Sequence, residues 1–531
     1  MRFSHFIKCV CRFIASFALA LGAIEMRAAT EPSQPNIVLI LCDDLGYGDV
    51  RCFNPQGKIA TPEMDRLAAA GMIFTDAHTP SSVCTPTRYG LLTGRYNWRS
   101  RLQSGVLGGL SPRLIEPGRM TIASLLKEHS YATACVGKWH LGMDWGRLPG
   151  KEVTELGIET PAQARNVDYT QRIANGPNSV GFDYYFGISA SLDMVPYAFI
   201  ENDRLTEQPD GEVSYPMMHG RDGNTTRLGP HAPGFSGYDV LPTLTRKAAE
   251  FIAQRAADAR AGKPFFLYVP LASPHTPILP TPEWQGRSGL NPYADFVMQT
   301  DWSVGQIAAE IEKHGLTAET LFIVTSDNGC APQAKFEELR AKGHEPSHVF
   351  RGNKADIYDG GHRVPFIVRW PAKVKAGTTS DQTICLTDWL ATIAQIISAK
   401  LPDNAGEDSA SFLPALLGAA TAPVREAIVH HSINGSFAIR QGSWKLALTP
   451  SSGGWSAPRP DTPAAKKLPP VQLFDLASDI GEQRNVQAEH PEVVTRLTQL
   501  LEKYVADGRS TPGAPQQNTV PIKLWKERAA E

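Results

Sequence analysis

The sequence predicts an α/β protein in which a large, mostly parallel β-sheet lies between layers of helices and is followed by a smaller antiparallel α+β domain. Short apolar segments alternate with amphipathic helical segments from about residue 36 to residue 400, a pattern typical of a parallel sheet covered on both faces. Beyond about residue 420, short strand-like segments follow one another directly, as in an antiparallel meander. We therefore divide the chain into residues 1–29, a signal peptide, 30–420, a large α/β domain, and 421–531, a small α+β domain.

Apolar runs bounded by turn residues define the elements of the large domain. The predicted strands are Ile37–Cys42, Tyr131–Val136, Phe265–Pro270, Leu321–Thr325 and Pro365–Trp370. The predicted helices are Met64–Gly71, Met120–His129, Leu241–Ala257, Asp295–His314 and Asp388–Ser398. Two polar, weakly periodic stretches, residues 144–180 and 202–237, are expected to be surface loops that shape a pocket.

The small domain is predicted to be a four-stranded meander closed by a helix. Its strands are expected at Ala427–His431, Ser436–Arg440, Lys445–Leu448 and Gln472–Leu476. A loop rich in Pro, Ser and Gly, Pro450–Pro470, interrupts them, and an amphipathic helix follows at Glu492–Ala506.

The first 29 residues have the order of a secretory signal peptide. Three basic residues precede the apolar run Phe13–Ile24, and two alanines follow it. The run is shorter than the roughly 20 residues that a membrane span needs, so we expect export and no stable span. An uncleaved interfacial anchor is the alternative. Export would put the protein in the periplasm or outside the cell if it is bacterial. In a eukaryote it would be lysosomal or secreted.

The formal charge of −2 excludes one broad class of function. A general nucleic-acid binder normally carries a basic excess, and this chain of 531 residues has none. We therefore expect no nucleic-acid partner.

Polar side chains follow four of the predicted strands. In open α/β sheets ligands bind at the carboxyl ends of the strands, so these side chains are expected to meet at one edge. They are Asp43 and Asp44 after the first strand, Lys138 and His140 in Gly137–Gly142, His275 in Ser273–Pro277, and Asp327 and Asn328 in Ser326–Gly329.

Three carboxylates and an amide oxygen are the ligands that hard cations prefer. We predict a Ca²⁺ site, with Mg²⁺ as the alternative, rather than a zinc site. Asp43 and Asp44 taken alone would fit a turn or a helix cap equally well. The three negative charges exceed the two positive charges of the ion, so an added anionic ligand needs further cations. The candidates for that role are Arg88, Lys138, His275 and Lys354.

Cys84 lies directly before a predicted helix. Thr85 is expected to cap this helix, with Pro86 at its first position. A cysteine at a helix N-terminus would have a lowered pKa and be nucleophilic, whereas most free cysteines are buried structural thiols. Both interpretations remain open on the residues alone.

The segment Cys84-Thr85-Pro86-Thr87-Arg88 resembles the C-x-P-x-R motif of the sulfatase family, and Leu-Leu-Thr-Gly-Arg follows it as in that family. Further blocks in the same order resemble the family, from Asn36 to about Val486. They are Asp43-Asp44 with Gly46, Gly137–Gly142, Pro274-His275, Asp327–Gly329, Arg351–Lys354 with Asp359–Pro365, and Leu473–Leu476 with Asp479, Glu482 and Asn485.

The resemblance implies an alkaline-phosphatase-type fold and hydrolysis of aryl or carbohydrate sulfate monoesters by S–O cleavage. It implies that a formylglycine-generating enzyme converts Cys84 to Cα-formylglycine, which joins Asp43, Asp44, Asp327 and Asn328 around the metal ion. Arg88, Lys138 and Lys354 would neutralise the sulfuryl group. His275, or Lys354 beside it, would protonate the leaving oxygen, and His140 would take a proton from the modified residue. Ser191 falls near a substrate-contact position of the family.

Two other functions fit parts of this pattern. A related phosphatase or phosphodiesterase would use a Ser or Thr nucleophile and two zinc ions, but Asn328 stands where such a relative often has histidine. A non-catalytic binding protein would keep Cys84 unmodified.

Overall fold

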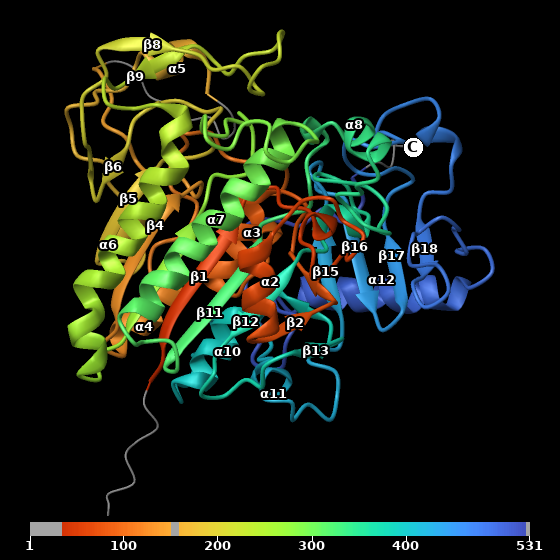
Figure 1. Cartoon of the computed structure of the whole chain (residues 1–531). Coiled ribbons are helices and arrows are strands. Elements are labelled where there is room, and N and C mark those ends of the chain that lie inside the picture. The colour runs from red at the N-terminus through yellow and green to blue at the C-terminus, as the bar shows by residue number, and fades with distance from the viewer. Residues whose placement is uncertain (1–33, 150–158, 527–531) are drawn as a thin grey trace, which may run out of the picture. The chain divides into compact units, whose positions relative to one another are not determined.

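The computed structural model describes residues 34–149 and 159–526. The predicted signal peptide and its cleavage site lie outside the described residues. Ten strands form the main sheet (Figure 1). Their order is β13 (Thr378–Ser380), β2 (Met72–Phe74), β12 (Phe366–Arg369), β11 (Thr320–Ser326), β1 (Asn36–Cys42), β10 (Phe265–Pro270), β4 (Ala132–Lys138), β5 (Tyr184–Ile188), β6 (Ile200–Glu201) and β7 (Arg204–Leu205).

The five central strands, from β11 to β5, are parallel and carry the core. In the register of β1, Leu39 pairs with Ile323 of β11 and with Tyr268 of β10. All seven residues of β1 and of β11 are buried. A strand buried on both faces can be apolar throughout, which explains the continuous runs in the sequence.

The flanking strands are mixed in direction. β12 is antiparallel to β11 and to β2, and β6 and β7 are antiparallel to their neighbours. The sheet is therefore parallel in its centre and mixed at its edges. An apolar run identifies a strand but carries no information about its direction, so the sequence alone could not show this.

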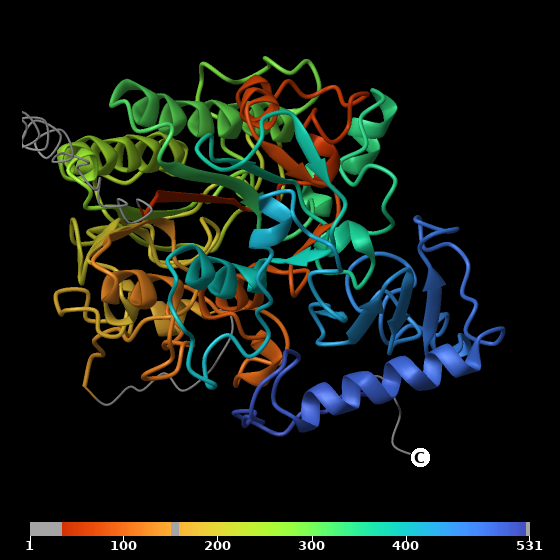
Figure 2. The same ribbon diagram turned by 90° about the horizontal axis from the view of Figure 1, so that it is seen from below.

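Two layers of helices cover the sheet (Figure 2). On one face α2 (Pro62–Ala69), α6 (Val240–Arg260) and α7 (Pro292–Lys313) pack together, and on the other α3 (Cys84–Thr93), α4 (Ile122–Glu128) and α10 (Trp389–Ile396) do so. These layers confirm the predicted α/β architecture. Several boundaries move: α7 begins three residues before the predicted start, where Asn291 accepts a hydrogen bond from the amide of Ala294 at 3.1 Å as its N-cap.

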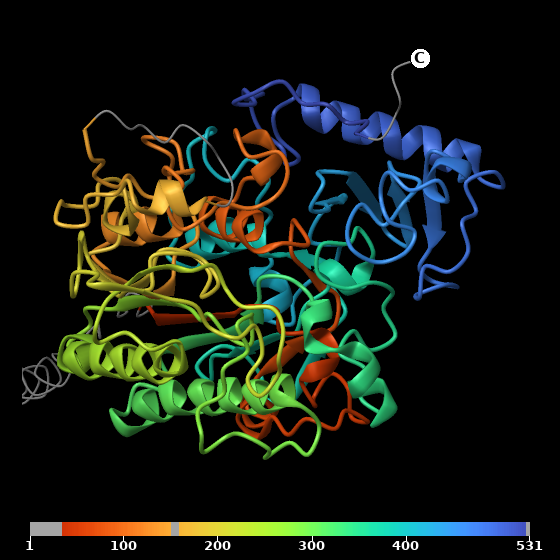
Figure 3. The same ribbon diagram turned by 90° about the horizontal axis from the view of Figure 1, so that it is seen from above.

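The C-terminal strands form a second sheet beside the first (Figure 3). This sheet, called here the C-terminal sheet, is antiparallel throughout, and α12 (Pro491–Ala506) packs on β16 and β17. The predicted meander and closing helix are confirmed. Its strands are β15 (Ile428–His431), β16 (Phe437–Gln441), β17 (Trp444–Ala447) and β18 (Gln472–Asp475).

Short elements complete the described chain. The predicted surface loops contain α5 (Pro161–Ala164) and the hairpin of β8 (Gly211–Val213) with β9 (Gly229–His231). The others are α8 (Phe336–Ala341), α9 (Asp359–His362), α11 (Leu413–Leu416), and the parallel pair β3 (Ala77–His78) and β14 (Ile384–Cys385). Within residues 34–149 and 159–526, none of the helices is both long and apolar enough to cross a bilayer.

Candidate active site

The carboxyl ends of four adjacent parallel strands bring the predicted polar residues together. Strands β11, β1, β10 and β4 are neighbours in that order, so the loops that follow them meet at one edge. A close approach of two strands at this edge requires a glycine, because a Cβ on Gly137 would lie 1.9 Å from the carbonyl oxygen of Pro270. The convergence that the sequence predicted is therefore present in the fold.

Four oxygen-bearing side chains form the centre of the cluster. Asp43, Asp44, Asp327 and Asn328 are each at most 1% exposed. Asn328 Nδ2 donates to Asp44 Oδ1 at 2.7 Å, and the amide of Asp44 donates to Asp327 Oδ1 at 3.3 Å. Asp43 Oδ1 and Asn328 Oδ1 are buried and have no hydrogen-bond partner among the described residues. Two unsatisfied buried acceptors beside two further carboxylates fit a hard divalent cation.

Three cations surround these acids. Lys138 Nζ lies 2.5 Å from Asp43 Oδ2, and Lys354 Nζ lies 2.7 Å from Asp44 Oδ1. Arg88 donates from Nη2 and Nε to Asp327 Oδ2 at 2.7 and 3.0 Å, and its Nη2 lies 3.6 Å from Asp43 Oδ2. The site therefore holds the positive charge that an anionic ligand needs.

Mutual interaction of the charges shifts the pKa values of these groups. Burial opposes ionisation of Asp43, but Lys138, His275 and Arg88 together hold the pKa of its carboxyl well below the usual range. Burial and the neighbouring charge of Asp43 raise the pKa of Asp327. Burial disfavours the Lys354 ammonium, yet the charges of Asp44, Asp43 and Asp327 together outweigh it and raise the pKa of Lys354. Lys354 is thus held in its charged form.

Cys84 is the first residue of α3 and is 2% exposed. The predicted cap was wrong by two residues: Val83 is the N-cap, and Thr85 Oγ1 instead accepts a hydrogen bond from the amide of Leu107 at 3.2 Å. Burial raises the pKa of the Cys84 thiol although Lys138 and Lys354 oppose this. The lowered pKa expected for a nucleophilic thiol is therefore not found.

Two histidines complete the set, and each has one ring nitrogen fixed by a carbonyl. His140 Nε2 lies 2.7 Å from the carbonyl oxygen of Leu107, and its buried Nδ1 has no partner in the part of the chain that the structure describes. His275 Nδ1 lies 2.5 Å from the carbonyl oxygen of Thr276, and its Nε2 lies 3.8 Å from Asp44 Oδ2. Since a carbonyl can only accept, the second nitrogen of each ring is available for proton transfer.

Ser191 follows β5, the next strand of the same sheet. It is 2% exposed, and its hydroxyl has no hydrogen-bond partner within the described ranges. No contact joins it directly to the acidic cluster among the hydrogen bonds and ion pairs of the described residues. Its role as a substrate contact stays a prediction.

Sequence reasoning missed several features of the site. The Tyr293 hydroxyl lies 2.5 Å from Asp49 Oδ2 and 3.2 Å from the carbonyl oxygen of Asp44, although Tyr293 belongs to a helix with no recognisable motif. Asp44 and His140 have left-handed backbones, with φ of 67° and 54°. A non-glycine residue in this region is uncommon and often marks a functional position, but the sequence carries no signal of it.

A second cluster of polar side chains, His78, His362 and His430, is also buried. Lys445 Nζ donates to His362 Nε2 at 3.1 Å, since an ammonium can only donate. His362 Nδ1 lies 3.0 Å from His78 Nδ1, and His78 Nε2 lies 2.9 Å from Asp76 Oδ1 and 3.1 Å from Arg440 Nη1. Both ring nitrogens of His78 and of His362 have polar partners, whereas the buried Nε2 of His430 has none among the described residues.

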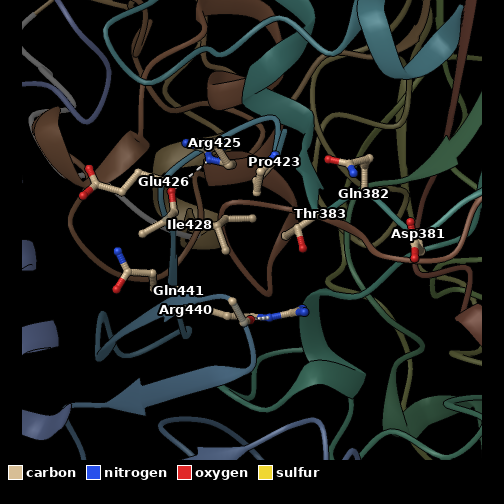
Figure 4. A pocket seen from close by; sticks show the side chains of 11 residues that line it. Asp381, Gln382, Thr383, Pro423, Arg425, Glu426, Ile428, Arg440 and Gln441 are labelled. Atoms are coloured by element: carbon tan, nitrogen blue, oxygen red, sulfur yellow. Dashed lines mark hydrogen bonds between the residues drawn. The ribbon is translucent and has the colours of Figure 1, made fainter. Parts of the chain in front are cut away.

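A cavity of about 600 Å³ lies apart from the acidic cluster (Figure 4). Arg440 and Arg425 face it, but they pair with Asp76 at 2.9 Å and with Asp388 at 3.0 Å respectively. Its lining includes none of the predicted site residues, so we do not place the reaction there.

Comparisons with known proteins agree with this geometry. The family model described as Sulfatase matches residues 35–399. An N-acetylgalactosamine-6-O-sulfatase of Bacteroides thetaiotaomicron is 36% identical over 510 residues, covering 88% of this chain and 93% of that protein. Human arylsulfatase A is 33% identical over 521 residues, with 94% and 92% covered.

A solved structure from work on the metabolism of multiple glycosaminoglycans by Bacteroides thetaiotaomicron superposes with a TM-score of 0.74. It is 34% identical and covers 89% of this chain and 99% of that one. The matching region spans the strands whose ends carry the acids, the lysines and the histidines. The chain therefore belongs to the sulfatase family and is a sulfuric ester hydrolase.

Proposed function

We propose that this sulfatase is exported and removes sulfate from a sulfated carbohydrate by S–O cleavage, with a divalent cation and a formylglycine derived from Cys84. The observation that carries the proposal is the pair of unsatisfied buried oxygens, Asp43 Oδ1 and Asn328 Oδ1, inside a ring of Arg88, Lys138 and Lys354. Such a site binds a cation and an anion side by side. The resemblance to an N-acetylgalactosamine-6-O-sulfatase supports a sugar sulfate over an aryl sulfate.

The residues fit the implied metal ion. Asp43, Asp44, Asp327 and Asn328 would hold Ca²⁺, with Mg²⁺ as the alternative, and residue 84 would complete the shell. A cation there supplies positive charge for the oxygens of the sulfate group and of the attacking residue.

The surroundings of Cys84 fit a modified residue rather than a thiol. The hydrated aldehyde of formylglycine supplies two hydroxyls on one carbon, one to attack sulfur and one whose deprotonation releases sulfate. Cys84 and the four residues after it are buried, so a formylglycine-generating enzyme would have to act on this segment before folding is complete.

The cations of this chain would neutralise the sulfuryl group. Lys138 and Lys354 each contact one acid of the cluster. The remaining N–H groups of each ammonium can donate hydrogen bonds to sulfate oxygens. Arg88 donates from Nη1 to the carbonyl oxygen of Lys138 at 3.1 Å, which fixes both residues relative to each other. Fixed charges in a water-poor site stabilise a transition state without reorganisation.

The two histidines have opposite roles. His275 would hold its second proton on Nε2, near Asp44, and give it to the leaving oxygen as the S–O bond breaks. The electron pair of that bond stays with the alcohol oxygen, which leaves as the free alcohol. Lys354 is the alternative donor. His140, neutral and with Nδ1 unoccupied, would accept the proton that is lost when sulfate is released.

A hydrolysis screen tests the proposal. Mature, converted protein is incubated with N-acetylgalactosamine 6-sulfate, its 4-sulfate isomer, a chromogenic aryl sulfate and the matching aryl phosphate, and released anions are quantified. We expect sulfate from one sugar with a kcat/KM at least about tenfold above that for the aryl sulfate, and little phosphate. Release of phosphate but not sulfate would overturn the proposal.

Export is tested separately by amino-terminal sequencing of secreted protein. We expect the mature chain to begin near Ala29 to Ser33. A secreted protein that still begins at Met1 would contradict cleavage.

A further inference from the structure

Backbone hydrogen bonds connect the C-terminal sheet to two segments of the active site, those that carry Cys84 and Lys354. The amide of Ser82, two residues before Cys84, donates to the carbonyl oxygen of His431 at 3.1 Å. The amide of Ala355 donates to the carbonyl oxygen of Ser82 at 2.8 Å. The amide of Ile433 donates to the carbonyl oxygen of Ala355 at 3.0 Å. These three bonds join the end of β15 to the segments that carry Cys84 and Lys354.

Ala355 has an unusual backbone for a residue with a Cβ. Its φ is 81°, in the left-handed region, and it is fully buried. Such a conformation costs free energy and persists where the surroundings fix it. Gly454 lies in the loop between β17 and β18, residues 448–471, called here the C-terminal loop. It packs against Ala355, because a Cβ on Gly454 would lie 2.3 Å from the carbonyl oxygen of Ala355 and 2.6 Å from Asp356 Oδ1.

Asp356, the next residue, is a fully buried carboxylate held by backbone amides. Its Oδ1 accepts hydrogen bonds from Trp455 at 2.7 Å and Ser456 at 3.0 Å, and its Oδ2 accepts one from Asn353 at 3.0 Å. Asp356 has no ion pair within residues 34–149 and 159–526, so these amides carry its stabilisation. It ties the residue before Lys354 to the C-terminal loop across about 100 residues of sequence.

The position of the Lys354 backbone matters because its side chain is long and flexible. Its amide donates to the carbonyl oxygen of Cys330 at 2.9 Å, and its ammonium reaches Asp44. The contacts that hold Asn353 and Ala355, the residues on either side of Lys354, therefore fix where the Lys354 ammonium can lie.

We propose that Asp356 is a positioning residue for the sulfatase reaction, through which the C-terminal sheet and its loop hold Lys354 in the site. The inference rests on the role of Lys354 in the proposed function. The Asp356 carboxylate bonds backbone amides and none of the side chains that would hold the metal or the sulfate, so it would act through the backbone of residues 353–355.

The first test substitutes Asp356→Asn in the mature, converted full-length enzyme, assayed with a chromogenic aryl sulfate. Asparagine has the same shape but lacks one acceptor oxygen, so an amide of Asn353, Trp455 or Ser456 loses its partner. A small displacement of a catalytic group can cost on the order of 100-fold in rate, so we expect kcat to fall about 10- to 100-fold while KM changes less than about threefold.

Asp295→Asn is the matched control. Asp295 is also buried and accepts hydrogen bonds from two backbone amides, those of Gly286 and Ser288, both at 2.8 Å. It holds a different segment, and its substitution is expected to leave kcat within about twofold while affecting stability. A kcat for Asp356→Asn that matches this control would overturn the proposal.

A double-mutant cycle with Lys354→Ala separates positioning from a general structural effect. If Asp356 acts through Lys354, the double variant is no less active than Lys354→Ala alone. If the two losses multiply instead, Asp356 does not act through Lys354 and the proposal fails.

A second variant perturbs the same contact from the other side. Gly454→Ala places a methyl group against Ala355 and Asp356, whereas Gly211→Ala adds one where no atom lies within 4 Å. Of these two variants, we expect only Gly454→Ala to lower kcat and to speed amide hydrogen exchange in residues 350–358. Unchanged exchange and kcat in both Gly454→Ala and Asp356→Asn would overturn the proposal.

The two proposals can be told apart. If the wild-type enzyme releases no sulfate from any substrate, the proposed function fails. If wild type is active and Asp356→Asn equals it in kcat, only the positioning inference fails.

Discussion

His140 Nε2 lies 2.7 Å from the carbonyl oxygen of Leu107. The carbonyl can only accept, so this nitrogen carries the proton of the neutral ring and Nδ1 keeps its lone pair. Burial, with the charges of Lys138 and Arg88, holds the pKa of His140 well below its usual range. The ring is therefore fixed as a neutral base.

We predict that His140→Gln lowers kcat by about 10²- to 10⁴-fold, because an amide cannot take up the proton. Steady-state kinetics with a chromogenic aryl sulfate would measure this. His129→Gln is the control, since His129 Nδ1 lies 2.9 Å from the carbonyl oxygen of Leu125 in the same kind of contact but outside the site. Equal kcat values for the two variants would contradict the role.

The pH profile follows from the same contact. A base works in its neutral form, and a lowered pKa keeps His140 neutral to lower pH than free histidine. The loss of wild-type kcat that comes from protonation of His140 should therefore lie well below pH 6.5, and the residual kcat of His140→Gln should not show it. A loss centred near 6.5 that persists in the variant would contradict the assignment.

The metal site makes a prediction about Asp327. Asp327→Asn should remove bound Ca²⁺ and most activity, because it takes a charge from the cluster and leaves Arg88 without its carboxylate. Elemental analysis of dialysed protein gives the metal content. Asp388→Asn is the control, since Asp388 is a buried acid paired with Arg425 at 3.0 Å outside the cluster. It should lose stability but keep its metal.

How much of the fold and of the site could be predicted from the sequence depends on how far apart in the chain the interacting residues lie. Asp43 and Asp327 could be placed together because each directly follows an apolar strand, and parallel neighbours end at one edge. The direction of β12 could not be predicted, nor could the left-handed backbone of His140, because both are imposed by packing. Asp356 was missed because two of its three partners, Trp455 and Ser456, lie about 100 residues away, and all three offer backbone amides, which leave no trace in residue type.

The start of α3 shows the limit of local rules. Thr85 followed by Pro86 matches a preferred helix start, yet the helix begins at Cys84 and Thr85 instead bonds the amide of Leu107. A tertiary contact outweighed the local preference, which is worth about 1 kcal/mol.

Asp301 provides a prediction about stability. It is buried, its carboxylate accepts hydrogen bonds from the amides of Met64 and Glu63 at 2.8 and 3.0 Å, and burial raises its pKa to about 7. The unfolded value is near 4, so the folded state binds this proton more tightly. The contribution of Asp301 is full below pH 4 and is lost as the pH rises to 7, at most about 4 kcal/mol.

Thermal unfolding from pH 4 to pH 8 tests this. The difference in Tm between Asp301→Asn and wild type should grow in favour of the variant as the pH rises, because asparagine cannot ionise. A difference that is constant with pH would contradict the raised pKa.

The last prediction concerns Cys84, whose raised pKa makes a thiolate unfavourable. Serine offers one hydroxyl, where a hydrated aldehyde has two. We expect Cys84→Ser to keep its fold and metal but to lose turnover. Its hydroxyl attacks sulfur, the alcohol leaves with a proton from His275, the proton lost by the serine hydroxyl restores that of His275, and a stable serine sulfate ester remains. Intact-mass measurement after exposure to an aryl sulfate should show one added SO₃ group, and Cys84→Ala should show none. Wild-type protein from a host without the converting enzyme should be inactive. If that unconverted protein were fully active and iodoacetamide abolished its activity, the thiol itself would be the nucleophile, and the formylglycine mechanism would be wrong even with every other residue in place.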